Sequence, residues 1–387
     1  LTISGKGAMK DYFHDSPATQ KKDIVKKVVI EEGVTSIGDY AFFGYSSLTS
    51  IEIPESVTSI GIYAFCDCSS LTDITIPGSV TSIGEGAFSG CTVLKSITIP
   101  KSVTSIGSDV FYGCDNLTEV LLEGGSTLTS DNLGVDASKI ATYWNEDNLT
   151  WTLDADGTLT ISGSGAMKAY DTDDSPATQK KDNVNKVVIE NGITSIGAYA
   201  FYDCSSLTDI TIPGSVTSIG EGAFYGCSGL TSITIPKNVT SIGDYAFSNC
   251  GNLASIEIPS SVTSIGNGAF SICTGLTSIN IPENVTSIGT GAFQRCSNLA
   301  SITIPDGVKS IEDSAFYECT GLTGITIPES VTSIGEYAFD SCNKLASITI
   351  PSSVTSIGVG VFNHCSSLKE VLLENGSTLT SENLGVD

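Results

Sequence analysis

The chain has 387 residues, 40% of them hydrophobic and 16% charged, and its 43 acidic and 18 basic residues give a formal net charge of −25. This balance excludes the basic stripe that a nucleic-acid binder needs, and it opposes attachment to an anionic membrane surface. No stretch approaches the roughly 18 apolar residues of a membrane span, so membrane insertion is not expected. We attribute the acidic excess to the solubility of an apolar-rich chain rather than to a patch made for a basic partner.

The chain opens with a phrase that it later repeats. Residues 1–5 (LTISG) recur at 159–163, where they form the second half of a longer phrase that begins at Trp151. We therefore expect the sequence to start partway through a motif, and further domains beyond either end are left open.

From residue 30 onward a single unit of 23 residues repeats, with the consensus I-P-x-x-V-T-S-I-G-x-x-A-F-x-x-C-x-x-L-x-x-I-x. Eleven of the twelve cysteines keep this period: Cys68, Cys91, Cys114, Cys204, Cys227, Cys250, Cys273, Cys296, Cys319, Cys342 and Cys365. Ten of the twelve prolines keep it as well, from Pro54 to Pro351. A period of this length predicts a solenoid, in which each coil buries its apolar face against its neighbours.

The twelve units fall into two blocks, four starting at Ile30 and eight starting at Ile189. Both blocks end in near-identical text, at residues 120–136 and 371–387, and near-identical text also precedes each block. We therefore expect three parts: residues 1–136 as a cap, four coils and a C-terminal cap; residues 137–150 as a linker; and residues 151–387 as a cap, eight coils and a C-terminal cap.

Within each coil the residue pattern predicts a strand, a corner and a short helical turn. Leu71, Ile74 and Ile76 alternate with polar residues as in a strand, and the following proline ends it because it has no N–H to donate. Val-Thr-Ser-Ile-Gly then predicts a corner, and Gly-x-x-Ala-Phe-x-x-Cys a single helical turn with Phe and Cys inward. Stacked coils would place like residues about 4.8 Å apart.

The ends of a solenoid need polar caps, because a terminal coil would otherwise expose its apolar face. Residues 151–153 and 158–161 alternate around the turn at 154–157, which predicts a β-hairpin that caps the second block. The first block keeps only the second strand of its equivalent hairpin.

The repeat resembles that of the BspA-like leucine-rich-repeat family, through the 23-residue period and words such as SIGEGAF at residues 82–88. The similarity covers about residues 28–122 and 187–373, and the phrase at 151–167 also resembles the cap found before such repeats. It implies a right-handed leucine-rich-repeat solenoid with one strand and one short helical turn per coil, secreted or displayed on a microbial surface. Some members are adhesins, and the family has no common enzymatic activity or cofactor.

The cysteine ladder is interpreted as a column of buried free thiols. Parallel side chains in a stack would keep their Cβ atoms near 4.8 Å, beyond the usual disulfide range, and a column does not converge on a zinc ion. We expect native protein to resist thiol reagents, with Cys66, the one cysteine off the ladder, as the accessible thiol. Tyr45 takes the ladder position in the first coil.

Nothing in the sequence predicts catalysis. The only two histidines, His14 and His364, cannot be paired with a nucleophile. The glycines at residues 84–90 have the wrong spacing for a phosphate loop, and residues 154–157 lack most ligands of a calcium loop. We therefore expect no enzyme, no cofactor and no metal site.

Two surfaces remain as binding candidates. The outward strand positions are mostly serine and threonine, which offer few anchors. Tyrosines instead gather in two columns beside the expected helical turn, and these are the candidate ligand contacts: Tyr40, Tyr63, Tyr199, Tyr245 and Tyr337 in the first, and Tyr112, Tyr202, Tyr225 and Tyr317 in the second. The competing interpretation, slightly favoured, is that these rings only cover gaps between coils.

We interpret the protein as a non-enzymatic, adhesin-like binding module, extracellular or on the cell surface, that recognises host or neighbouring-cell proteins. The alternative is a carbohydrate- or polymer-binding accessory or spacer module of a larger extracellular protein. Self-association along the rod is left open.

Overall fold

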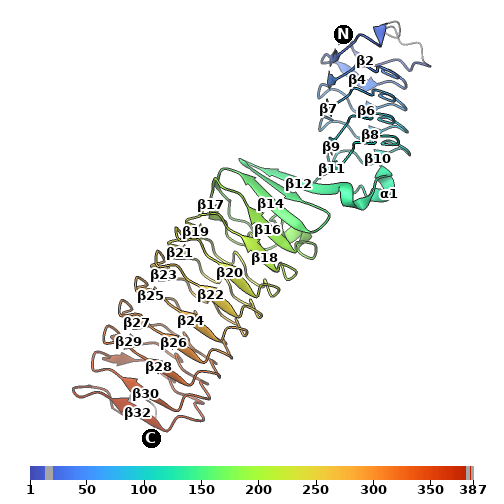
Figure 1. Cartoon of the computed structure of the whole chain (residues 1–387). Helices are drawn as coiled ribbons and strands as arrows, with labels where there is room; N and C mark the ends of the chain where they lie inside the picture. The colour runs from blue at the N-terminus through green and yellow to red at the C-terminus, as the bar shows by residue number, and fades with distance from the viewer. Residues whose placement is uncertain (14–20, 381–383, 385–387) are drawn as a thin grey trace. The chain divides into compact units, whose positions relative to one another are not determined.

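The structure of the protein is a computed structural model that describes residues 1–13, 21–380 and 384. Nearly all regular structure in these residues is short β-strand, and the single α-helix among them is α1 (Ser130–Leu133). Strands of neighbouring coils pair in parallel, and Figure 1 draws them as successive arrows. The β-solenoid predicted from the period is confirmed. Its residues form two compact units, described separately below.

The first unit comprises Leu1–Trp144 and Thr152–Asp156. One parallel sheet contains β1 (Thr2–Ile3), β3 (Lys27–Ile30), β5 (Ser50–Glu52) and β7 (Asp73–Ile74). A second contains β2 (Gly7–Ala8), β4 (Val34–Ile37), β6 (Ser59–Ile60), β8 (Ser82–Ile83) and β10 (Ser105–Ile106). The strands β9 (Ser96–Ile99) and β12 (Ile140–Glu146) pair with opposite edges of β11 (Glu119–Glu123). Each coil thus contributes one strand to each of two sides.

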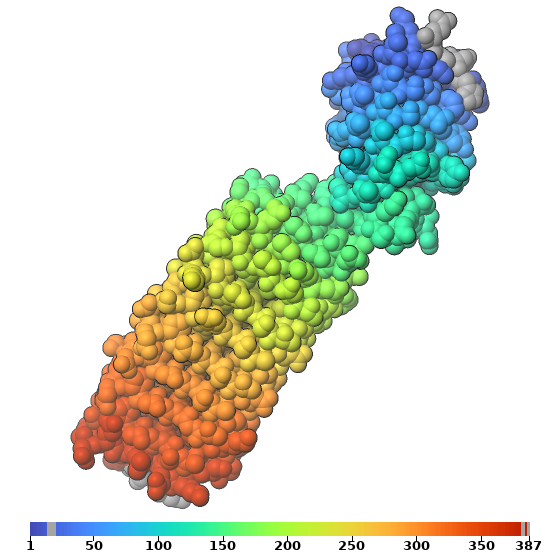
Figure 2. Space-filling model, in the orientation of Figure 1, coloured from blue at the N-terminus to red at the C-terminus, as the bar shows by residue number. Residues whose placement is uncertain are grey.

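The second unit comprises Asn145–Trp151 and Gly157–Asp387. On one side of the coils lie β14 (Thr158–Gly163), β16 (Lys186–Ile189), β18 (Asp209–Thr211), β20 (Ser232–Thr234), β22 (Ser255–Glu257), β24 (Ser278–Asn280), β26 (Ser301–Thr303), β28 (Gly324–Thr326), β30 (Ser347–Ile350) and β32 (Glu370–Leu373). On the other lie β15 (Gly165–Ala166), β17 (Ile193–Ile196), β19 (Ser218–Ile219), β21 (Ser241–Ile242), β23 (Ser264–Ile265), β25 (Ser287–Ile288), β27 (Ser310–Ile311), β29 (Ser333–Ile334) and β31 (Ser356–Ile357). Figure 2 shows consecutive parts of this unit packed directly against one another.

The pairing register places identical repeat positions opposite each other. Ile233 pairs with Ile256 in the next coil, and Ser241 with Ser264 on the other side. This register buries the isoleucines in the interior and leaves the serine and threonine hydroxyls outside. Because the repeat sequence is uniform, each repeat position forms a column of like residues along the solenoid.

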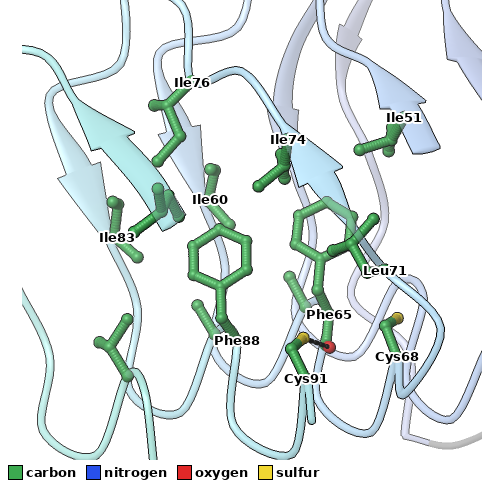
Figure 3. Packing of buried hydrophobic residues seen from close by; sticks show 14 of the residues in the cluster. Ile51, Ile60, Phe65, Cys68, Leu71, Ile74, Ile76, Ile83, Phe88 and Cys91 are labelled. Carbon is green, nitrogen blue, oxygen red and sulfur yellow. Dashed lines mark hydrogen bonds between the residues drawn. The ribbon is translucent and has the colours of Figure 1, made fainter. Parts of the chain in front are cut away.

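The interior of each coil is filled by the Phe, Cys, Leu and Ile positions of the repeat. Figure 3 shows Phe65 and Phe88 side by side, with Cys68 and Cys91 beneath them. The phenylalanine rings stack along both units, with centroids 5.3–6.0 Å apart and planes within 11° of parallel. In the closing stretch before residue 137, Thr129 caps α1 and Leu133 is buried, while the role of this stretch as a cap of the first unit remains a prediction.

The expected helical turn is not confirmed, because two positions in each coil adopt left-handed backbone conformations. They are the second residue after the repeat glycine, such as Tyr63 with φ 51°, and the residue before the ladder cysteine, such as Asp67 with φ 58°. A right-handed helix cannot include such residues, so the segment folds as consecutive tight turns. Its amides pair with the next coil, as in Phe65 N–H to the carbonyl of Ala87 at 2.8 Å. The strain is greatest at Ile272 (φ 61°), since a β-branched residue rarely adopts this conformation.

The segment predicted as a linker contains regular structure. The 3-10 helix η2 (Ala137–Lys139) and β12 occupy most of residues 137–150, and β13 (Leu149–Leu153) follows. β13 neighbours β14 in the strand order, at the positions of the predicted hairpin. The roles of linker and cap assigned to these residues remain predictions.

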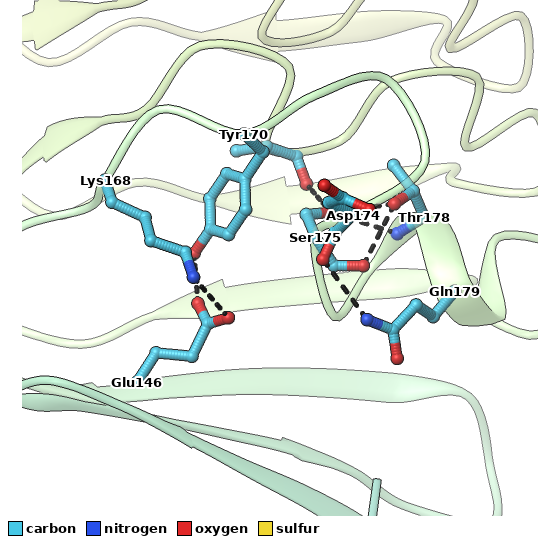
Figure 4. A network of polar contacts seen from close by, with 8 residues as sticks. Glu146, Lys168, Tyr170, Asp174, Ser175, Thr178 and Gln179 are labelled. Atoms are coloured by element: carbon cyan, nitrogen blue, oxygen red, sulfur yellow. Dashed lines mark hydrogen bonds and ion pairs between the residues drawn. The ribbon is translucent and has the colours of Figure 1, made fainter. Parts of the chain in front are cut away.

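A polar network stabilises the segment that precedes the first coil of the second unit (Figure 4). The 3-10 helix η3 (Thr178–Lys180) lies in this segment. Tyr170 donates to a carboxylate oxygen of Glu146, and Lys168 forms an ion pair of 3.0 Å with the other oxygen. Ser175 is fully buried and donates to the carbonyl of Ala200 at 2.6 Å. Burial first, and then the hydrogen bond to Glu146, raise the pKa of Tyr170 well above its usual range.

Candidate binding surface

The two tyrosine columns border the tight turns on either side of the buried Ala-Phe pair. The first column holds Tyr40, Tyr63, Tyr199, Tyr245 and Tyr337, and the second holds Tyr112, Tyr202, Tyr225 and Tyr317. Their exposure is uneven: Tyr112 is 73% exposed, Tyr245 46% and Tyr337 40%, while the other six are partly buried. Every one of the nine rings is accessible to some extent, so the columns remain usable as a surface.

In the first column four of the five rings lie over a glycine of the following coil. A Cβ atom added to Gly268 would come within 2.5 Å of the Tyr245 ring. The same fit recurs for Tyr63 over Gly86, Tyr199 over Gly222 and Tyr337 over Gly360. These glycines also have φ between 53° and 66°, which other residues adopt only with strain. The tyrosines therefore pack against the solenoid, as the competing interpretation expected.

Two rings of the first column are also fixed by a carboxylate from the next coil. The hydroxyl of Tyr63 donates to Glu85 at 3.0 Å, and that of Tyr199 donates to Glu221. The hydrogen bond to Glu221 raises the pKa of Tyr199 to about 12, and burial adds to the shift. These two hydroxyls stay protonated at physiological pH and remain available as acceptors.

The structure brings three of the candidate tyrosines together at the start of the second unit. Tyr202 and Tyr225 stack with centroids 4.9 Å apart and planes 11° from parallel, and Tyr199 meets Tyr202 edge-on at 5.9 Å. Beside them, the Lys181 ammonium and an Asp203 oxygen lie 3.3 Å apart. We call Tyr199, Tyr202 and Tyr225 the aromatic cluster. It combines ring faces, hydroxyls and charges of both signs, a mixture that suits protein and sugar surfaces.

The first unit has a related but smaller grouping. Tyr40 lies 5.4 Å from Tyr63 and 5.8 Å from Phe43, ring centroid to ring centroid. Phe43 occupies the repeat position of Tyr202, and it was not predicted because the two columns were defined by tyrosine alone. Among the described residues, Tyr112, Tyr245, Tyr317 and Tyr337 make no ring contact with another candidate tyrosine.

All twelve cysteines are free thiols. Ten of the eleven on the ladder donate to the carbonyl of a phenylalanine in the preceding coil, as Cys91 does to Phe65 at 3.3 Å (Figure 3). The sequence identified the buried column but not this bond, which distinguishes cysteine from alanine or valine at the position. Desolvation raises the pKa of these thiols, to about 12 for Cys273 and Cys319.

The expectation that Cys66 is the accessible thiol was wrong. Its side chain is only 8% exposed, and burial raises its pKa to about 11. Although Cys66 occupies the second tyrosine column, small side chains in that column turn into the gaps between coils, as Ser248 and Ser271 also do. Cys365 is instead the most accessible thiol, the one cysteine outside the buried class.

The described residues contain no group of three or more metal-ligating side chains. His14 lies outside the described residues. His364 Nδ1 lies 3.0 Å from Asp340, a carboxylate that Ser341 also contacts, so both polar partners point at the acid rather than at each other.

Residues 18–133, 177–300 and 287–384 match the family model described as BspA type Leucine rich repeat region, in six copies. The chain belongs to the BspA-type leucine-rich-repeat family. Family membership agrees with a protein-binding repeat module, and the family is generally non-enzymatic. Among the residues that the structure describes, no helix combines the length and apolar character that a bilayer span requires.

Several solved structures are similar to this BspA-type chain. A leucine-rich repeat protein from Bacteroides ovatus is 30% identical, with a TM-score of 0.43, covering 90% of this chain and 81% of its own. A leucine rich cell surface protein from Faecalibacterium prausnitzii is 28% identical, with a TM-score of 0.39 and coverages of 94% and 90%. A leucine-rich repeat protein from Eubacterium ventriosum is 28% identical, with a TM-score of 0.41 and coverages of 88% and 89%. No protein with a curated description matches the sequence.

Proposed function

We propose that this chain is an adhesin-like binding module, secreted or displayed on a bacterial surface, that recognises a protein of a host or neighbouring cell. The aromatic cluster, which the fold assembles from two successive coils, carries the proposal. Tyrosine is enriched where proteins bind proteins, because it adds a large ring and a polar hydroxyl at a low entropic cost.

The remaining chemistry of the molecule supports a binding role. Family membership supplies a repeat scaffold that is generally non-enzymatic. The repetition leaves the interior nearly invariant and places the chemical variety in the turn columns, where Tyr, Asp, Glu and Asn mix.

The test is a binding screen of the full chain against immobilised matrix proteins, such as fibronectin, fibrinogen and collagen, and against polysaccharides. A variant with Tyr199, Tyr202, Tyr225 and Tyr245 all replaced by Ser should lose at least about tenfold in affinity for the captured protein, since aromatic anchors often contribute about 2 kcal/mol or more. The matched control replaces Thr75, Thr98, Thr211 and Thr234 by Ser on the strand side, and its capture should be unchanged.

Three results would count against the proposal. Unchanged capture by the tyrosine variant together with reduced stability would make the rings packing elements only. Capture of a polysaccharide and of no protein would support the accessory-module alternative. Absence of any capture would leave a spacer role.

A further inference from the structure

On the strand side of the second unit, Gly324 in β28 interrupts a run of serines. The equivalent residues in the four coils before it and in the coil after it are serines, among them Ser301 and Ser347. Neither geometry nor packing requires glycine here: its φ is not positive, and an added Cβ atom would have no heavy atom within 4 Å. The missing side chain therefore opens space on the surface instead of relieving a clash.

The parallel ladder of the strand side is interrupted between β28 and β30, as it also is between β18 and β20. Strands β20, β22, β24, β26 and β28 form one sheet, whereas β30 pairs only with β32 in another. A hollow of about 540 Å³ lies over β26, β28 and β30. Ligand pockets typically enclose about 300–1,000 Å³, so a small molecule fits the space.

The lining of the hollow specifies the chemistry of its ligand. Serine and threonine residues of three strands line it, together with Ile325 and Glu374. Ile325 is more exposed than Ile302 (6%) and Ile348 (2%), its counterparts in the adjacent coils. Glu374 accepts a hydrogen bond from the Ser352 amide at 3.2 Å, and its carboxyl group also shares a hydrogen bond with that of Glu329, which raises the pKa of Glu329.

We propose that this hollow binds a neutral saccharide of about two sugar units. Sugar hydroxyls exchange hydrogen bonds with the serine and threonine hydroxyls and donate to Glu374, and a C–H face of a sugar ring packs on Ile325. The lining contains no basic residue, so anionic ligands meet only repulsion from Glu374. This site is separate from the aromatic cluster and goes beyond the proposed protein-binding function.

The experiment titrates the full chain with maltose, cellobiose and lactose, followed by saturation-transfer NMR and calorimetry, with glucuronate as the anionic comparison. At least one neutral disaccharide should bind saturably, with a Kd on the order of 1 mM, as for a small ligand held by a few hydrogen bonds. Gly324→Val should weaken binding at least about tenfold by filling the hollow, and Glu374→Gln about three- to tenfold by replacing an ionised acceptor.

Matched controls establish whether a loss of binding arises in this hollow. Ser255→Val adds the same bulk in β22, where the ladder is intact, and should leave sugar binding unchanged. Gly324→Ser restores the side chain of the neighbouring coils and should also weaken binding, which keeps the test valid if the valine variant folds poorly. The variant that replaces the four tyrosines by Ser should bind sugar normally.

The proposal is overturned by the absence of saturable binding at about 10 mM disaccharide, well above the expected Kd. Equal binding by folded Gly324→Ser and wild type, or glucuronate binding as tight as that of the neutral sugars, would overturn it as well.

Discussion

The phenylalanine column and the first tyrosine column lie two residues apart in the same turns, yet they are built in opposite ways. In the interior, identical rings stack coil after coil at 5.3–6.0 Å. At the surface, Tyr245 is followed one coil later by Gly268, whose missing side chain makes room for the ring. A buried stack can repeat one residue because each ring fills the space between two others. In the surface column, four of the five tyrosines are instead followed one coil later by a glycine, and only Tyr40 is followed by another tyrosine, Tyr63.

The largest expected effect is that alkaline pH will destroy the interior column before the surface columns respond. Burial raises the pKa of all twelve thiols, which means that the folded state keeps protons that the unfolded state releases above about pH 9. This stability is fully present below pH 9 and is lost as pH rises. Above that pH each thiol lowers the free energy of unfolding by about 1.4 kcal/mol per pH unit. The summed loss for twelve thiols over one pH unit exceeds a typical free energy of unfolding of about 5–15 kcal/mol.

Circular dichroism from pH 7 to pH 11 should show cooperative unfolding between about pH 9 and pH 10.5. Replacing Cys250 and Cys273 by Ala should make the pH dependence shallower. A protein that keeps its full signal at pH 11 would contradict the buried-thiol column.

The next effect breaks the interior stack at one ring. Phe247 lies between Phe224 and Phe270, at 5.3 and 5.5 Å. Phe247→Ala should reduce the free energy of unfolding by about 3–5 kcal/mol because it leaves a cavity between two rings. The surface counterpart, Tyr245→Ser, should cost clearly less. Urea unfolding measures both, and equal losses would show that the two columns contribute alike.

A smaller effect tests the fit of tyrosine over glycine. Gly268→Ala should cost about 1–3 kcal/mol, because alanine at φ 56° is strained and its Cβ meets the Tyr245 ring. Combining it with Tyr245→Ser should recover the steric part and leave about 1 kcal/mol of backbone strain. Additive losses in this double-mutant cycle would mean that the ring does not occupy the space above Gly268 in solution.

The smallest effect concerns a single thiol. A maleimide reagent should modify Cys365 first in the native chain and all twelve cysteines in denaturant, with the site identified by peptide mass spectrometry. Cys365→Ala should abolish the fast phase, and Cys66→Ala should leave it unchanged. Fast labelling at Cys66 would restore the expectation that the structure contradicts.

The sequence predicted the columns of the repeat well, because Cys, Phe and Ile positions keep their period and their burial together. It failed where the backbone departs from common conformations. Tyr63 and Asp67 adopt left-handed backbone conformations that their residue types do not predict. Tight turns therefore form where a helical turn was expected. The sequence shows that Gly222 follows Tyr199 by one period. The reason for this pairing becomes clear only from the structure, in which the ring lies over the glycine. The hollow at Gly324 was not predicted, because in the sequence this glycine is only one exception in a run of serines.

The backbone bonds between coils have a mechanical consequence. On the turn side, bonds such as that from Phe224 N–H to the carbonyl of Ala246 at 2.8 Å connect successive coils. On the strand side, pairs such as Ile233 with Ile256 add to them except where the ladder is interrupted. A pulling force applied at the two ends of a unit would load the bonds of one coil at a time, so the coils would detach one after another. Each detached coil of 23 residues would lengthen the chain by about 75 Å at roughly 3.3 Å per residue. A surface protein built this way would yield under tension in many small, repeatable steps, which single-molecule extension would resolve as evenly spaced force drops.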